Sequence, residues 1–249
     1  MVVLNRLFMS ALVGAGAGII GTGIGGTLAF FLKNPTRRLL SILMSFSSGL
    51  MLAVVCFDLL PTAFEIGGLS SGITGIVIGV VLIMICEDLV GSLTHKREGK
   101  DRAYIKTGVL FGIGIALHNF PEGLAIGSGM MAGSSYGISL SILIALQDIP
   151  EGIAMATPLI AARVSSKKVL LYTLLAGMPT GVGALIGHII GGISPVLISM
   201  CLGFAGGAMV YITCGELIPE SHNIYTGKVS GLGAVIGIIV GIILTYIIH

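Results

Sequence analysis

Charged residues are scarce in this sequence, and tryptophan is absent. Only 10% of the 249 residues are Asp, Glu, Lys or Arg, 55% are hydrophobic, and the mean hydropathy is +1.06. Soluble domains average about 25% charged residues, so the composition excludes an ordinary soluble domain. The 39 glycines fit close helix packing in a membrane, where small residues let backbones approach. We therefore predict an integral membrane protein in the plasma membrane or a bacterial inner membrane.

Signatures of several enzyme classes are also missing. There is no Walker A sequence and no His-Glu-x-x-His spacing, which argues against ATP hydrolysis and against a zinc hydrolase. The stretch GTGIGG at 21–26 matches G-x-G-x-x-G, but it lies in an apolar run with no strand before it. It predicts helix packing, and we expect no enzyme activity, no cofactor, no nucleotide and no nucleic-acid partner.

Apolar runs of about 20 residues, the length that crosses a bilayer, occur eight times. They lie near 9–32, 38–61, 69–93, 105–131, 136–162, 168–192, 195–219 and 228–248. The loops between them are short, so we expect one all-α transmembrane domain over 1–249. The polar stretch THKREGKDRAYIK at 94–106 is expected to be a cytoplasmic loop.

Lysine and arginine are divided unequally between the loops. Twelve of the thirteen follow the first, third, fifth and seventh runs, and Arg6 alone lies on the other side. Because cytoplasmic loops carry the excess of Lys and Arg, both termini are predicted to face outside. The number of spans is then even, which agrees with eight.

Carboxylates lie inside the runs without any accompanying Lys or Arg. They are Asp58, Glu122, Asp148, Glu151 and Glu216, with Glu87 and Asp88 near the inner end of the third run. A charged side chain at the centre of a bilayer costs about 2.5 to 3.5 kcal/mol on insertion scales. Protons, a water-filled cavity or a bound cation could neutralise them.

The spacing of the polar residues favours a cation. HNFPEG places His118 and Glu122 on one helical face with Asn119 beside them, and LQDIPEG does the same for Gln147, Asp148 and Glu151. If the two faces meet, they offer the mixed nitrogen and oxygen ligands that suit Zn²⁺, Fe²⁺ or Mn²⁺.

Two prolines predict openings in these helices. Pro121 and Pro150 lack an N–H and press on the preceding turn, which frees the carbonyls of Leu117 and Leu146. Broken helices are tolerated at membrane depth where they line a cavity, and transporters build ion sites from them.

A second repeated motif lies farther out. DLLP at 58–61 is expected to end the second helix and ELIP at 216–219 the seventh. These helices run in opposite directions, which predicts an inverted repeat of helices 1–3 and 6–8 around a central pair, a 3+2+3 arrangement. The acids at the two mouths would form an entrance of Asp58 and Glu65 and an exit of Glu216, Glu220 and His222.

The paired motifs HNFPEG and LQDIPEG resemble those of the ZIP family of divalent metal transporters, in the bacterial branch with Gln-Asp in the fifth helix. The resemblance implies uptake of Zn²⁺, or of Fe²⁺, Mn²⁺ or Cd²⁺, by alternating access in a homodimer, with the metal as substrate. It implies a primary site of His118, Glu122, Gln147, Asp148, Glu151 and Met51, and it makes Asn119 a ligand of a second site. Relatives often carry a glutamate where Thr180 lies here, so a single-metal centre is the alternative to a two-metal one.

Two other function classes use similar residues. An intramembrane metal hydrolase needs the missing His-Glu-x-x-His spacing. A metal-selective channel uses the same acids without alternating access. The sequence disfavours the hydrolase and leaves open the channel, the preferred metal and any coupling to protons.

Overall fold

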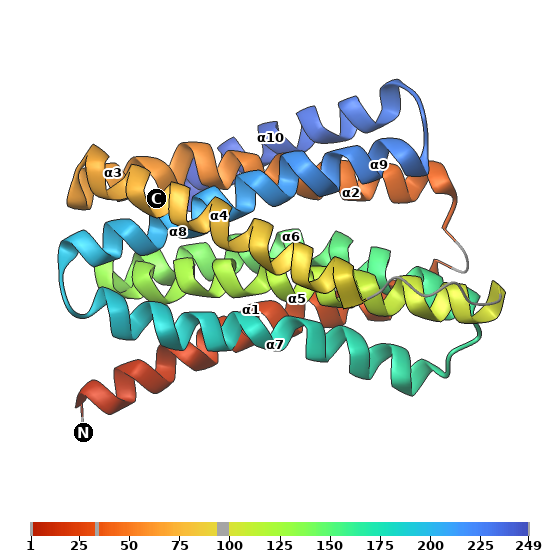
Figure 1. The fold of residues 1–249 in the computed structure, drawn as a ribbon, viewed down its shortest axis with the longest axis horizontal. Helices are drawn as coiled ribbons and strands as arrows, with labels where there is room; N and C mark the ends of the chain where they lie inside the picture. Colours follow the sequence, from red (N-terminus) through yellow and green to blue (C-terminus); the bar gives the residue numbers. More distant parts are fainter. Residues whose placement is uncertain (1, 33–34, 94–99, 249) are drawn as a thin grey trace.

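The computed structural model describes residues 2–32, 35–93 and 100–248, and within these ranges the regular structure is helical throughout (Figure 1). The helices are α1 (Val2–Phe31), α2 (Arg37–Val54), α3 (Leu60–Gly67), α4 (Leu69–Leu93), α5 (Lys100–Ala132), α6 (Ser134–Ala161), α7 (Ser166–Gly191), α8 (Pro195–Ile212), α9 (Ile218–Ile224) and α10 (Lys228–Ile248). Two π-helical turns join them, η1 (Val55–Leu59) between α2 and α3 and η2 (Thr213–Leu217) between α8 and α9.

The predicted spans correspond to long helical rods. In the described ranges, seven segments are long and apolar enough to cross a bilayer: Asn5–Phe31, Arg37–Gly67, Leu69–Leu89, Ser134–Ala161, Ser166–Gly191, Pro195–Ile224 and Lys228–Ile247. The eighth rod is α5, and the polar residues of HNFPEG in its middle lower its hydropathy. The all-α, membrane-spanning prediction is confirmed.

Two predicted helix ends are wrong. The second rod continues through Pro61 to Gly67, and the seventh continues through Pro219 to Ile224. In η1 the N–H of Leu60 bonds to the carbonyl of Val55, five residues back. This wider turn relieves the clash that a proline ring makes with the carbonyl four residues before it, so the rod passes the proline without ending.

The predicted cytoplasmic loop is also too long. Residues 94–99 lie outside the described residues, and α5 already begins at Lys100. The expected breaks at Pro121 and Pro150 are likewise absent from the described helices, because α5 and α6 run through both prolines.

Glycine allows α1 and α6 to approach closely. A Cβ at Gly25 would overlap the carbonyl of Ile149, and a Cβ at Gly152 would overlap the backbone of Thr22. Only glycine permits such contact between two backbones. The GTGIGG stretch therefore packs helices, as predicted, and the glycine of LQDIPEG serves the same contact.

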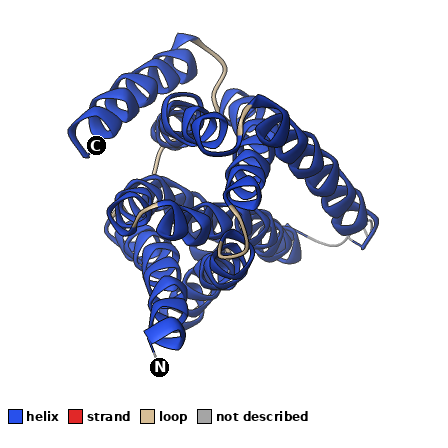
Figure 2. Ribbon diagram, turned by 90° about the vertical axis from the view of Figure 1, so that its left-hand side faces the viewer, coloured by secondary structure: helices blue, strands red, loops and turns tan. Residues whose placement is uncertain are grey.

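The rods form two groups. One contains α1, α5, α6 and α7, and the other contains α2 to α4 and α8 to α10 with both π turns. In Figure 1, α2 and α10 lie at the top, α1 and α7 at the bottom, and α5 and α6 between them, while Figure 2 shows the same rods nearly end on. The two groups meet where α2 and α8 face α5 and α6.

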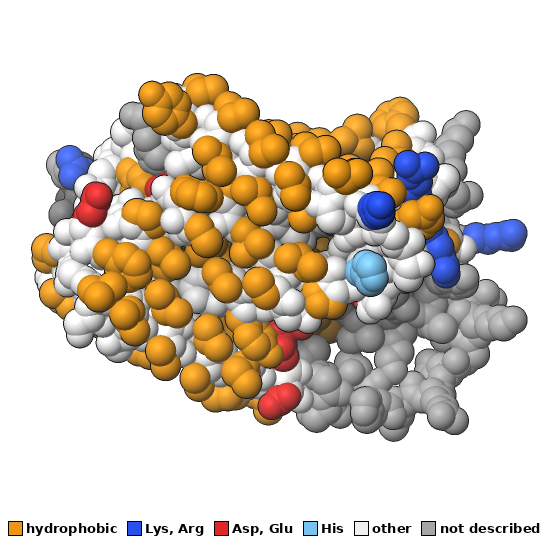
Figure 3. Space-filling view, turned by 90° about the horizontal axis from the view of Figure 1, so that it is seen from above, with side chains coloured by type: hydrophobic (Ala, Val, Ile, Leu, Met, Phe, Trp, Pro, Cys, Tyr) orange, Lys and Arg blue, Asp and Glu red, His pale blue; other side chains and the backbone are white. Residues whose placement is uncertain are grey.

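The surface has an apolar middle and a basic end. Figure 3 shows hydrophobic side chains over the middle of the molecule and Lys and Arg mainly at one end. Exposed basic residues include Arg37, Arg38, Lys167, Lys168 and Lys228. Both chain termini lie at the same end of the bundle (Figure 1), as an even number of passes requires. This surface is that of a multi-pass membrane protein.

Candidate metal site

The polar faces of α5 and α6 meet inside the first group of helices. The Nε2 amide of Gln147 donates a hydrogen bond to Oε1 of Glu122. Glu122, Gln147 and Asp148 are fully buried, as is Asn119, and Glu151 is only 3% exposed. The structure thus brings together the residues of HNFPEG and LQDIPEG, which lie more than 20 residues apart in the chain.

Many polar atoms of this group have no hydrogen-bond partner. Such buried atoms are His118 Nδ1, Asn119 Oδ1, Glu122 Oε2, Gln147 Oε1, Asp148 Oδ1 and Oδ2, and Glu151 Oε2. Buried polar groups in proteins almost always have partners, and exceptions in one place call for an explanation such as an ion. With one exception these atoms are oxygens, which are hard ligands for a divalent cation.

Ionisable groups are concentrated at the same place. The ionisable groups that act on Glu122, Asp148 and Glu151 are one another and His118. Among the described residues, no three His, Cys, Asp or Glu side chains already have the spacing of a metal site. The amide N–H₂ of Gln147 lies against a carboxylate oxygen that a cation would otherwise contact.

A serine of the second group contacts the site, and the sequence did not predict it. Ser47 Oγ donates to Oε1 of Glu151 at 3.1 Å and to the carbonyl of Gln147 at 2.9 Å. A serine in a transmembrane run carries no distinguishing signal, because most bond to their own helix. Ser47 connects α2 to the acid-bearing face of α6.

The second predicted position contains only neutral groups. Asn119 donates through Nδ2 to the carbonyl of Ala176 on α7 at 2.7 Å, which leaves its Oδ1 unpartnered. Thr180 lies one turn farther along α7, and its buried Oγ1 also lacks a partner. An amide oxygen and a hydroxyl are available there, without an additional carboxylate from α7.

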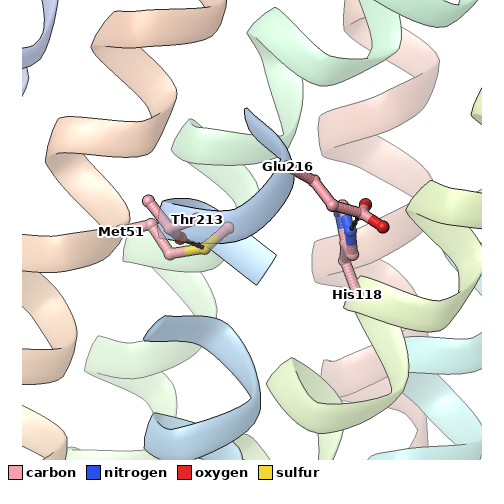
Figure 4. A network of polar contacts seen from close by, with 4 residues as sticks. All are labelled: Met51, His118, Thr213 and Glu216. Carbon is pink, nitrogen blue, oxygen red and sulfur yellow. Dashed lines mark hydrogen bonds and ion pairs between the residues drawn. The ribbon is translucent and has the colours of Figure 1, made fainter. Parts of the chain in front are cut away.

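The predicted exit acids approach the site directly. His118 Nε2 lies 3.6 Å from Oε2 of Glu216 on η2, so this pair connects the two groups (Figure 4). A cavity of about 470 Å³ is lined by both residues together with Glu151 and Glu220. His222 is exposed on α9 and does not line it. The cavity therefore extends from the buried ligands to α9.

Glu87 on α4 is a further acid at this end to which the sequence assigned no role. It interacts with Glu216 and Tyr211 and lies within electrostatic reach of His118. Its Oε1 is buried without a hydrogen-bond partner. The sequence signal was present, since Glu87 is an acid in a span without a basic neighbour, but only the packing of α4 on α8 brings it to Glu216.

The predicted entrance is closed. Asp58 on η1 is 3% exposed and interacts with Tyr136 of α6, and Glu65 is exposed on α3. Around Asp58 the core contains fully buried side chains such as Leu59 and Leu140. The molecule is thus packed at the Asp58 end and hollow at the Glu216 end.

Met51 does not present its sulfur to the cavity. Its Sδ accepts a hydrogen bond from Thr213 Oγ1 at 2.8 Å, and Met51 is not among the residues that line the cavity (Figure 4). Of the predicted ligands, those of α5 and α6 come together, whereas Met51 is engaged by η2.

Comparison with known proteins identifies the family. Residues 92–249 match the family model described as ZIP zinc transporter. The zinc transporter ZupT of Clostridium perfringens is 30% identical over 271 residues, which cover 95% of each chain.

Two further relatives carry similar descriptions. The zinc transporter ZupT of Corynebacterium glutamicum is 34% identical over 240 residues, covering 86% of this chain and 91% of the relative. The zinc transporter ZIPB of Bordetella bronchiseptica is 31% identical over 232 residues, covering 88% of this chain and 75% of the relative. With these matches and with the motif-bearing faces of α5 and α6 in contact, the chain belongs to the ZIP family of metal transporters.

Proposed function

We propose that this protein transports Zn²⁺ into the cytoplasm through a site formed by His118, Glu122, Gln147, Asp148 and Glu151, with Fe²⁺, Mn²⁺ and Cd²⁺ as competing substrates. The observation that carries the proposal is the set of buried, unpartnered ligand atoms on α5 and α6. A divalent cation satisfies these atoms and offsets the charge of three carboxylates at once. The names of the relatives support zinc as the substrate.

Binding requires one local change. The Gln147 amide has to rotate so that Oε1, now unpartnered, faces the ion and Nε2 leaves Glu122. Neutral imidazole and ionised carboxylates are the binding forms, so protonation competes with the metal. Asn119 and Thr180 would then contribute neutral oxygens to any second ion, which favours one tightly held ion over two.

Charge and shape support transport toward the cytoplasm. The cavity opens toward α9, at the end where α10 begins with Lys228. Loops rich in Lys and Arg face the cytoplasm, so this conformation is open to the inside and both termini face outside. The ion would enter past Glu65 and Asp58 and leave past Glu216, Glu87, Glu220 and His222.

Alternating access is supported by the two groups of helices. The site is held mainly by α5 and α6, whereas the mouth acids Asp58 and Glu216 belong to the other group. Rocking one group against the other would expose the same ligands to each mouth in turn. The matching π turns at DLLP and ELIP support the 3+2+3 inverted repeat within one domain over 1–249.

The closed outer half favours a carrier over a channel, since a channel would need a continuous path. The cargo passes through chemically unchanged, so no enzymatic step is involved. We also propose a homodimer, because the spans on α4 and α10 are only 22% and 28% buried and present long apolar faces.

Uptake into proteoliposomes that contain a metal-sensitive dye tests the proposal. Glu122→Gln and Asp148→Asn should reduce Zn²⁺ uptake by at least about 10- to 100-fold, the loss seen even when only a supporting partner of a metal ligand is removed. Asp88→Asn, which removes an exposed carboxylate outside the site, is the matched control and should transport like wild type. Wild-type uptake by both site variants would refute the proposed site.

A further inference from the structure

Glu151 is held from the opposite helix group, unlike the other two carboxylates of the site. Both oxygens of Asp148 lack a hydrogen-bond partner, and Glu122 accepts a bond from Gln147, which belongs to the same group of helices. The Oε1 atom of Glu151 instead accepts a hydrogen bond from Ser47 at 3.1 Å, while its Oε2 has no partner. Ser47 lies on α2, so this bond crosses the boundary between the two groups.

Ser47 directs its hydroxyl away from its own helix. Ser45 and Ser48 each donate to the carbonyl four residues earlier in α2, which is the common pattern for a serine in a helix. Ser47 donates toward α6, to Glu151 and to the carbonyl of Gln147 at 2.9 Å. A hydroxyl has one proton to donate, and an ionised carboxylate attracts it more strongly than a neutral carbonyl does. Ser47 is fully buried, which keeps water from this bond.

Glu151 is also the carboxylate of the site that lies nearest the way out. It lines the cavity, whereas Glu122 and Asp148 lie behind it and are fully buried. Helix α2 contributes Met44 to the same wall, one turn before Ser47. The hydroxyl of Ser47 thus acts on the acid that stands between the buried ligands and the open mouth, which an ion leaving the site would contact last.

A hydrogen bond to one carboxylate oxygen competes with a metal ion for that oxygen. An ion can take both oxygens of Glu151 only after the bond from Ser47 breaks, and hydrogen bonds to charged groups are among the stronger ones. We infer that Ser47 is a positioning residue for ion release, which holds Oε1 of Glu151 so that only Oε2 is available to the ion while the cavity is open. This inference rests on the proposed function, because it takes Glu151 as a ligand and the cavity as the inner exit.

The effect of Ser47 belongs to one conformation. Because Ser47 and Glu151 lie in different helix groups, rocking one group against the other separates them and frees both oxygens of Glu151. A ligand shifts a protein toward the conformation that binds it better. The ion is therefore held more tightly when the outer mouth is open and more loosely when the inner mouth is open, which promotes release to the inside.

The test measures how fast Zn²⁺ leaves the purified protein. Protein in detergent is loaded with Zn²⁺ and mixed with a fluorescent chelator in a stopped-flow instrument. Ser47→Ala frees Oε1 of Glu151, so release should slow by about tenfold, and the Kd from titration calorimetry should fall by the same factor, as expected for one hydrogen bond to a charged group. Ser48→Ala is the matched control, because Ser48 is equally buried and donates to the carbonyl of Met44 in its own helix. It should release Zn²⁺ at the wild-type rate.

The direction of the change separates positioning from a structural role, since lost packing would weaken binding or leave it unchanged. If wild type neither binds nor takes up Zn²⁺, the proposed function fails and the inference fails with it. If wild type transports Zn²⁺ and Ser47→Ala releases it at the wild-type rate or faster, or Ser48→Ala slows release as much, the inference alone is overturned. Ser47→Gly removes the same hydroxyl and replaces Ser47→Ala, with the same expectation, if the alanine variant does not fold.

Discussion

The two π turns have related sequences and very different surroundings. Residues 55–61 read VCFDLLP and residues 213–219 read TCGELIP, and each segment forms a π turn followed by a proline. Yet Asp58 is 3% exposed, whereas the side chain of Glu216 is 44% exposed. The acid in η1 is sealed in protein, and its counterpart in η2 faces a cavity.

The difference comes from the partners that cover each turn. Asp58 interacts with Tyr136 of α6 amid fully buried residues such as Leu59 and Leu140. Glu216 meets His118 at the wall of the cavity. Local sequence therefore specifies the π turn in both places, and the packing of other helices around each turn decides whether its acid is enclosed or faces a cavity.

Chemical labelling should give the largest contrast between the two turns. In a background without the four native cysteines, Glu216→Cys should react with a water-soluble maleimide more than about 100-fold faster than Asp58→Cys, because a buried thiol cannot reach the reactive thiolate state. Mass spectrometry of the labelled protein measures both rates. Equal rates would mean that the outer half is not closed in solution.

Removing the prolines should disrupt each π turn. Pro61→Ala and Pro219→Ala restore an N–H and abolish the ring clash, which allows an ordinary α-helix. A π turn holds about one residue more than an α-helical turn, so its conversion to an α-helix rotates the following helix by about 100° relative to the preceding one. The acid then no longer faces its partner on α5 or α6. We expect Zn²⁺ uptake to fall by about tenfold in each variant, measured by dye-loaded proteoliposomes.

Alanine replacement of Pro158 is the control for those two variants. Pro158 lies in α6 near its C-terminal end and outside both π turns. Pro158→Ala should leave uptake within about twofold of wild type, as expected for a change away from the reacting groups. Normal uptake by both Pro61→Ala and Pro219→Ala would show that the π turns are dispensable.

Neutralising the outer acid should have the smallest effect. Asp58→Asn keeps the shape of the side chain but removes a charge that attracts cations, so the KM for external Zn²⁺ should rise by about two- to threefold at low ionic strength. The increase should disappear in about 0.5 M salt, where charges are screened within a few ångströms. Glu216→Gln, on the opposite mouth, should alter the maximal rate and leave this salt dependence intact.

Much of the site could be predicted because it is local. His118 and Glu122 share a helical face through their spacing alone, as do Gln147 and Glu151. Apolar runs of sufficient length have one stable form in lipid, since every backbone group must be paired within the helix. That is why the eight rods agree with the sequence to within a few residues, apart from the ends that the π turns extend and the earlier starts of α1 and α5.

The remaining features depend on contacts between distant parts of the chain. Ser47 meets Glu151 across 104 residues, and Thr213 meets Met51 across 162. Neither residue carries a pattern that marks it, because serine and threonine are ordinary in membrane helices. The π turns also escaped prediction, since proline in a helix was expected to end or break it.

The sequence alone determined that this is a helical membrane protein, where its spans lie, and which acids share a face at mid-membrane. These properties follow from hydropathy, charge and helical periodicity, which act over one or two turns of chain. Only the tertiary structure decided that the faces of α5 and α6 meet, that Thr213 engages Met51, and that Glu216 is open while Asp58 is sealed. Those outcomes depend on how rigid helices pack against one another. The contacting segments lie far apart in the chain, so the local sequence of each one does not determine which residues meet.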